Sequence, residues 1–270
     1  MTQFRHNMSL PTVMLQSVSS ILQGQTPTRQ SFAFPFANHT HFEGKAVPSW
    51  LNLLAGTGDG TTAVAKAARG LGVFVSAIAT GGGAGTASEV QIDYNDVLSL
   101  PLLAGLVFGC RARLTAATYA SGCQLVMGFG SAKSTMANLD SQTYNCWFRA
   151  KVAASLSATV YAETDDNSTN TDLQDFGVSL AAPLLDSSAP TDGFHEFIID
   201  ASNLSQIDFY VDGVLRSTPA MGLKLSGAVA ASYVQPMLGI FKGGTHDIIS
   251  AEFDSLFVGA TRVSSANDLV

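Results

Sequence analysis

Apolar residues recur at every second position over most of the chain after residue 50. Between Cys146 and Ala162 each even-numbered residue is apolar, whereas most odd-numbered residues are polar or amphipathic. A period of two is typical of strands that bury one face in a core and wet the other. A segment of this length exceeds an average strand, so we expect the chain to turn near residues 153–155.

The same alternation covers four more segments, at 106–114, 125–129, 207–211 and 249–257. Asp212-Gly213 then predicts a tight hairpin turn into Val214 and Leu215. The segment 61–72 has a helical composition, but its context favours a strand. Clusters of turn residues separate the runs, and no βαβ rhythm is present. These patterns predict an all-β, antiparallel sandwich over residues 50–270.

Residues 1–49 have a different texture. Pro11 and Gly24 bracket a segment with helical spacing of its apolar residues, and the stretch that follows reads as extended. We interpret 1–49 as an extended, partly helical arm that docks on another subunit. The expected interface residues of this arm and its junction are apolar: Met14, Val18, Ile21, Leu22, Phe32, Phe34, Phe36 and Trp50.

The amino-acid composition argues against two classes of partner, membranes and nucleic acids. The 270 residues are only 13% charged, and their mean hydropathy is +0.23. No apolar run is long enough to span a bilayer, and the N-terminus makes a poor signal peptide. We therefore expect burial against other protein chains and no membrane partner. The net charge of −7 without a basic cluster also argues against nucleic acid.

Three cysteines, Cys110, Cys123 and Cys146, are too far apart in sequence for a CxxC metal or redox motif. Free cysteine is among the most buried residue types. We expect three buried, reduced thiols in a protein made in a reducing cytoplasm.

Residues 105–262 resemble the concanavalin A-like (laminin-G-like) jelly rolls. The resemblance lies in an ordered series of segments, of which Asp208-Phe-Tyr-Val-Asp-Gly213 is the most specific. The full layout, with an arm and a Gly-rich entry at 81–85, is similar to tailed-phage virion proteins of the head decoration and fibre types. This resemblance implies a jelly-roll fold, which hosts lectins, glucanases, adhesion modules and capsid parts.

Glucanase relatives carry an E-x-D-x-E pattern on one strand, which is absent here. The nearest approximations are Glu252 with Asp254, and Glu196 with Asp200. Two carboxylates that share a strand face without a third are typical of a solvated surface. We therefore expect no enzymatic activity and no catalytic residue.

Relatives of the lectin type hold Ca²⁺ with loop oxygens. Asp165, Asp166 and Asn167 lie in the one dense acidic loop and are weak candidates for a metal site. An acidic surface turn explains them equally well, so we expect no cofactor and no metal. Trp147, Tyr161 and Tyr210 face outward by strand parity. Outward aromatic residues suit either a subunit interface or a glycan contact.

These observations predict a non-enzymatic virion structural protein of a bacteriophage, assembled in the host cytoplasm. The favoured role is a capsid decoration (cement) subunit, a homotrimer that binds the major capsid protein or other virion proteins. Burial of about 2,000 Å² or more would hold it there. The alternative is a glycan- or receptor-binding module of a tail fibre or adhesin. A polysaccharide hydrolase is a third hypothesis.

Overall fold

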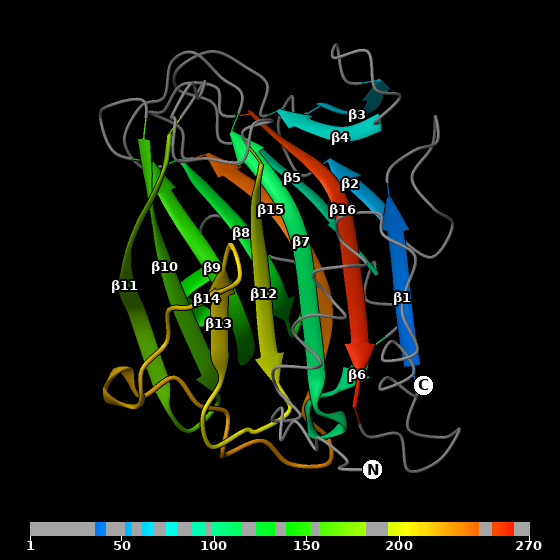
Figure 1. Cartoon of the computed structure of the whole chain (residues 1–270). Helices are drawn as coiled ribbons and strands as arrows, with labels where there is room; N and C mark the ends of the chain where they lie inside the picture. The colour runs from blue at the N-terminus through cyan, green and yellow to red at the C-terminus, as the bar shows by residue number, and fades with distance from the viewer. Residues whose placement is uncertain are drawn as a thin grey trace, which may run out of the picture.

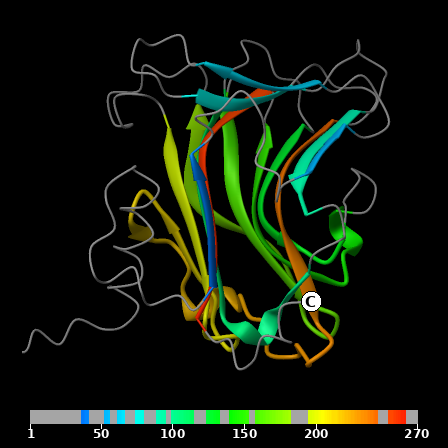
Figure 2. The same cartoon turned by 90° about the vertical axis from the view of Figure 1, so that its right-hand side faces the viewer.

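Two antiparallel β-sheets face each other in the computed structural model (Figure 1). Seen from the side, they form two layers (Figure 2). The structure describes eleven segments of the chain, and strands dominate them. These segments are 36–41, 52–55, 61–66, 74–79, 88–94, 99–114, 123–132, 139–152, 157–181, 194–242 and 250–261.

The first sheet has eight strands, and β16 (Ser250–Ala260) lies near its middle. β1 (Phe36–His41) also pairs with β16. The remaining strands, in spatial order, are β14 (Val214–Leu215), β13 (Asp208–Val211), β12 (His195–Ala201), β7 (Leu106–Leu114), then β16, β4 (Phe74–Ala79) and β3 (Thr61–Lys66).

The second sheet also has eight strands, of which β6 (Leu100–Pro101) pairs only with the start of β15 (Tyr233–Lys242). In spatial order the others are β11 (Asn170–Ala181), β10 (Ser157–Asp166), β9 (Tyr144–Val152), β8 (Gln124–Gly130), then β15, β5 (Ser88–Asp93) and β2 (Asn52–Ala55). The described segments also contain short 3₁₀ turns at η2 (Leu102–Ala104), η3 (Leu139–Ser141) and η4 (Pro219–Met221).

The core fills the space between the sheets. Phe148 of β9 lies at its centre, with ring centroids 5.1 Å from both Phe197 and Phe209 of the opposite sheet. The edge-to-face angles of these pairs are those that aromatic rings prefer. Phe176 of β11 adds a fourth ring, 6.0 Å from Phe148. One aromatic side chain therefore joins both layers.

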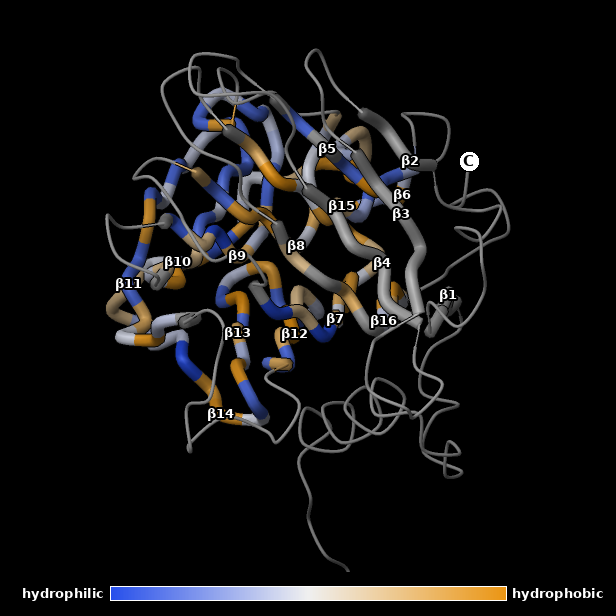
Figure 3. The backbone as a smooth tube through the Cα atoms, turned by 90° about the horizontal axis from the view of Figure 1, so that it is seen from above, coloured by the Kyte–Doolittle hydropathy of each residue, from blue (hydrophilic) through white to orange (hydrophobic). Residues whose placement is uncertain are grey.

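The predicted alternation is confirmed on the inward side. Cys146, Phe148, Ala150, Ala158 and Val160 are all fully buried. Figure 3, coloured by hydropathy, shows hydrophobic and hydrophilic positions alternating along strands of both sheets. β9 ends at 152, and β10, which begins at 157, pairs with it in the antiparallel direction. The strand direction therefore reverses between them, as the sequence predicts.

The predicted hairpin is also present. Val211 pairs with Val214 across Asp212 and Gly213. Both turn residues have positive φ, 51° and 73°, as a tight turn of this kind requires. Residues 61–66 form a strand, as their context predicts. The three cysteines are free and buried, and burial raises the pKa of Cys110 and Cys146.

The start of the sandwich differs from the predicted boundary at residue 49/50. Residues 36–41, predicted as arm, pair with β16 of the same chain from Phe36↔Ala260 to His41↔Ser255. β4 pairs only with residues 250–253 of β16. β1 therefore hydrogen-bonds to the backbone groups of the rest of β16, which β4 does not reach. The remaining expected interface residues, Met14, Val18, Ile21, Leu22, Phe32, Phe34 and Trp50, lie outside the described residues, as does the side chain of Phe36.

Among the residues that the structure describes, no helix has the length and apolar character needed to cross a bilayer.

Replacing Phe148 with alanine should lower the free energy of unfolding by about 3–5 kcal/mol, because the cavity would open between the two layers. Chemical denaturation measures this loss. Leu215→Ala is the matched control: this side chain is 47% exposed at the edge strand β14, and its removal should change stability by no more than about 0.5 kcal/mol. Equal losses for the two variants would contradict a core centred on Phe148.

Candidate functional site

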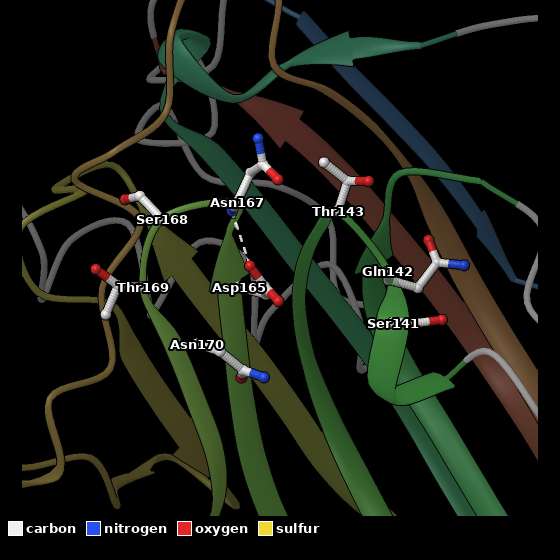
Figure 4. A pocket seen from close by; sticks show the side chains of 8 residues that line it. All are labelled: Ser141, Gln142, Thr143, Asp165, Asn167, Ser168, Thr169 and Asn170. Carbon is white, nitrogen blue, oxygen red and sulfur yellow. Dashed lines mark hydrogen bonds between the residues drawn. The ribbon is translucent and has the colours of Figure 1, made fainter.

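A polar pocket lies at one end of the second sheet, where β9 begins and β10 turns into β11. Its volume is about 290 Å³. One wall follows η3, and the other is the β10–β11 turn (Figure 4). Every lining side chain carries a hydroxyl, amide or carboxyl group: Ser141, Gln142, Thr143, Asp165, Asn167, Ser168, Thr169 and Asn170.

Asp166 holds the turn that forms one wall. Its Oδ1 accepts hydrogen bonds from the Ser168 N–H (3.0 Å), the Ser168 hydroxyl (2.8 Å) and the Thr169 N–H (2.7 Å). Its Oδ2 accepts one from the Gly227 N–H at 2.6 Å, which ties the turn to a loop about 60 residues away in sequence. Both oxygens are therefore engaged in shaping the pocket.

Burial favours the protonated form of Asp166, but the hydrogen bonds from Gly227, Ser168 and Thr169 outweigh it and hold the carboxyl pKa below its ordinary value. Charge-assisted hydrogen bonds of this kind are stronger than neutral ones. The carboxylate is a structural anchor of the turn.

Asp165 is the carboxylate that lines the pocket. Its Oδ1 accepts a hydrogen bond from the Asn167 N–H at 2.7 Å, drawn as a dashed line in Figure 4. Asn167 has a φ of 65°, a left-handed conformation that asparagine tolerates well. Partial burial and the neighbouring charges of Asp166 and Asp172 raise the pKa of Asp165, against the effect of this hydrogen bond.

The weak metal candidates Asp165, Asp166 and Asn167 do not assemble a ligand set. Within the described segments, no group of three or more His, Cys, Asp or Glu side chains is placed to hold a metal ion. Asp166 points its oxygens at backbone and hydroxyl donors of its own turn. The acidic turn is built by Asx-type hydrogen bonds.

The outer face of the second sheet, turned away from the core, is buried along its middle. A charged network lies on it: Arg149 Nη1 donates to Glu163 Oε2 at 2.9 Å and also bonds Asp140, while its Nε donates to Gln124. Arg149 and Glu163 are 2% and 1% exposed. Burial raises the pKa of Glu163, and Arg149 opposes that shift.

A small apolar cluster covers the same face beside this network. It consists of Val126, Leu139, Trp147, Met237 and Phe241. Leu139 belongs to η3, so this segment packs on the outer face of the sheet. The middle of this face is thus closed by packing.

Trp147 does lie on the outer face, as strand parity predicts. Its side chain is fully buried there, so it is not open to a glycan or to another subunit. A Cβ added to Gly130 would come within 3.1 Å of the Trp147 ring, which shows how closely the indole packs on that glycine. Tyr210 is also buried, at 8% exposure. Burial, with Asp208 and Asp200 nearby, raises its pKa to about 12. Tyr161 is half-buried, and its glycan contact stays a prediction.

The carboxylates considered for hydrolysis lie apart from the pocket. Glu196 and Asp200 are buried on β12 of the first sheet. Glu252 and Asp254 belong to β16, and their side chains lie outside the described residues. Sequence reasoning missed a set of alternating polar residues on β5, although the pattern was readable: Glu89, Gln91 and Asp93, all buried.

No family model matches the sequence. No curated protein matches it. Among solved structures, the carbohydrate recognition domain of Emp47p superposes with a TM-score of 0.51 at 12% identity, covering 84% of this chain and 96% of that one. The chain has a jelly-roll fold. This likeness confirms the concanavalin A-like β-sandwich that the sequence resembles.

Two further solved structures have lower scores. The endo-β-1,4-glucuronan lyase of the fungus Trichoderma reesei gives a TM-score of 0.49 at 12% identity, covering 84% of this chain and 95% of that one. A carbohydrate esterase of the Shiga toxin-encoding bacteriophage phi24B gives 0.43 at 15% identity, covering 77% and 89%.

Asp166→Asn should destabilise the jelly roll at neutral pH by about 1.5–3 kcal/mol, the range for hydrogen bonds to a charged group. Because the folded-state pKa of Asp166 is lowered, this stabilisation is present above about pH 4 and is lost as the pH falls below it. Denaturation of the protein and the variant from pH 7 to pH 2 measures the difference. Asp172→Asn, at an exposed position on β11, is the control.

The two stability curves should converge at the acid end, and Asp172→Asn should follow the unaltered protein throughout. A constant gap between the protein and Asp166→Asn at every pH would contradict a charged anchor.

Proposed function

We propose that this chain is a non-enzymatic binding subunit of a bacteriophage particle and that its jelly roll contacts a glycan at the polar pocket. The pocket carries the proposal. Its eight lining residues offer hydroxyl, amide and carboxylate groups side by side, and sugars present the same chemistry of donors and acceptors. The Asp166 anchor fixes one wall in advance, which lowers the ordering cost of binding.

The fold is compatible with this role. The solved structure with a TM-score of 0.51 is a carbohydrate recognition domain. A shared fold does not carry function by itself, because jelly rolls host many activities. The support therefore comes from the pocket's own residues.

A binding role without catalysis is favoured by the carboxylates. Glycoside hydrolysis uses a pair of carboxyl groups about 5–9.5 Å apart that flank the bond. Among the described lining residues, Asp165 is the one carboxylate. Its neighbour Asp166 uses both oxygens in the turn. Glu163 is paired with Arg149 on the closed face.

The second candidate is a capsid decoration subunit, a homotrimer assembled with the capsid in the host cytoplasm. The low charge of the chain supports it. So does the edge of the first sheet, where Val214 and Leu215 are 50% and 47% exposed on β14. Apolar side chains at an open sheet edge are suited to contact with another protein chain.

Thr143→Val and Asn170→Ala should each weaken glycan binding about tenfold, the cost of one lost hydrogen bond at roughly 1.4 kcal/mol. The measurement is binding of the protein to an array of bacterial surface polysaccharides. The glycan that binds most tightly is then titrated against each variant to give its affinity. Thr159→Val makes the same change on β10, outside the pocket lining, and should leave the affinity unchanged.

No binding to any glycan of the array would contradict the glycan role. Turnover of a bound polysaccharide by the purified protein would contradict the non-enzymatic role.

Removing residues 1–35 should convert an assembly into monomers if the arm joins subunits. The truncation stops before Phe36 because β1 belongs to the first sheet. Size-exclusion chromatography with light scattering should give about three times 28.2 kDa for the full chain and a monomer mass for the truncated one. Monomers in both cases, with no affinity for phage heads, would contradict the decoration role.

A further inference from the structure

The strand register shows what lies beside the pocket. Asp165 pairs with Asn145, Asn145 with Gly130, and Gly130 with Gln235. These four residues form one row across β10, β9, β8 and β15. The strands alternate in direction, so a step of two residues moves each strand toward the same end of the sheet.

One such step reaches the pocket. It leads from Asp165 to Asn167 and from Asn145 to Thr143, which both line the pocket. On β15 it leads from Gln235 to Tyr233. Tyr233, Thr143 and Asn167 therefore lie in one row at the same end of the sheet. β8 alone separates β15 from β9, so two strand spacings, roughly 10 Å, separate Tyr233 from the pocket wall at Thr143.

Tyr233 points away from the core. Its neighbour Val234 is fully buried in the main core, and Met237 and Phe241, which share the parity of Tyr233, pack in the cluster on the outer face. Tyr233 is 42% exposed, whereas Trp147 and Phe241, two aromatic residues of the same face, are fully buried. It is thus an aromatic side chain open to solvent beside the pocket.

Two more exposed apolar side chains belong to segments that hydrogen-bond to Ser232, the residue before Tyr233. Leu103 and Val229 are 44% and 57% exposed. The Leu102 N–H donates to the Ser232 carbonyl at 2.9 Å, and the Val229 N–H donates to the Ser232 hydroxyl at 2.8 Å.

The loop that leads into Tyr233 is tied to the pocket turn. The Gly227 N–H, two residues before Val229, bonds Asp166 of the pocket turn.

We propose that the site takes an oligosaccharide of at least two sugar residues, one in the polar pocket and the next with its apolar C–H face on Tyr233. This inference rests on the proposed glycan-binding function and names the ligand class for that site. A pyranose ring has polar edges and an apolar face, as a tyrosine has an apolar ring and a polar tip. A pocket of hydroxyls and amides with an aromatic residue roughly 10 Å away suits a chain of sugars better than a single one.

The test is a titration with mono-, di- and trisaccharides of glucose, galactose, mannose, rhamnose and N-acetylglucosamine. The variants are Tyr233→Ala and the conservative Tyr233→Trp. Leu215→Ala is the matched control, because it removes a side chain of similar exposure from the opposite sheet. Circular dichroism checks that each variant is folded.

We expect disaccharides or trisaccharides of at least one series to bind more tightly than the monosaccharide. Tyr233→Ala should weaken oligosaccharide binding about tenfold and leave monosaccharide binding unchanged. Tyr233→Trp should restore it, and Leu215→Ala should have no effect.

Two results overturn the proposal in distinguishable ways. Equal binding of monosaccharides and oligosaccharides, unaffected by Tyr233→Ala, would contradict the extended site and leave the pocket as the glycan contact. No binding of any sugar in the series would contradict the glycan-binding function and the extended site with it.

Discussion

Aromatic and aliphatic side chains from both sheets meet around Phe148. This contact determines which side chains of the strands face the core and which face outward. A strand residue faces either the core or the outside, and a shift by one position would exchange the two faces. With Phe148 against Phe197 and Phe209, Trp147 and Arg149 must lie on the outer face of the second sheet. The rest of the site follows from that register, because it aligns the strand ends at which Asn167, Thr143 and Tyr233 lie.

The outer face of the second sheet is closed along its middle. Polar side chains that a ligand could reach therefore lie at the strand ends. Arg149 and Glu163 are nearly inaccessible and satisfy one another. Removing one partner of such a pair would leave an uncompensated buried charge and destabilise the fold. At the end of the sheet the chain turns, backbone groups need partners, and Asp166 supplies them. The polar pocket is the open space beside that turn.

Sequence periodicity predicted the fold well because alternation reports directly on which face is buried. The strand pair at 144–166, the hairpin at Asp212-Gly213 and the buried cysteines were all readable. Parity does not report what covers the other face, so Trp147 and Tyr210 were assigned to the surface although they are buried. Tyr233 was overlooked because its importance depends on the register between β15, β8 and β9, which brings residues about 90 positions apart to one end. The pairing of residues 36–41 with β16 is likewise a long-range contact without a local signal.

The jelly roll is expected to bind its ligand at the strand ends and not on the closed middle of the outer face of the second sheet. Backbone amide chemical shifts, recorded during titration with the tightest-binding bacterial polysaccharide fragment, test this most directly. We expect the changes to gather at residues 141–143, 165–170 and 233, while Gln91, Arg149 and Glu163 keep their shifts. Changes centred on those three buried residues, with none at the pocket turn, would contradict it.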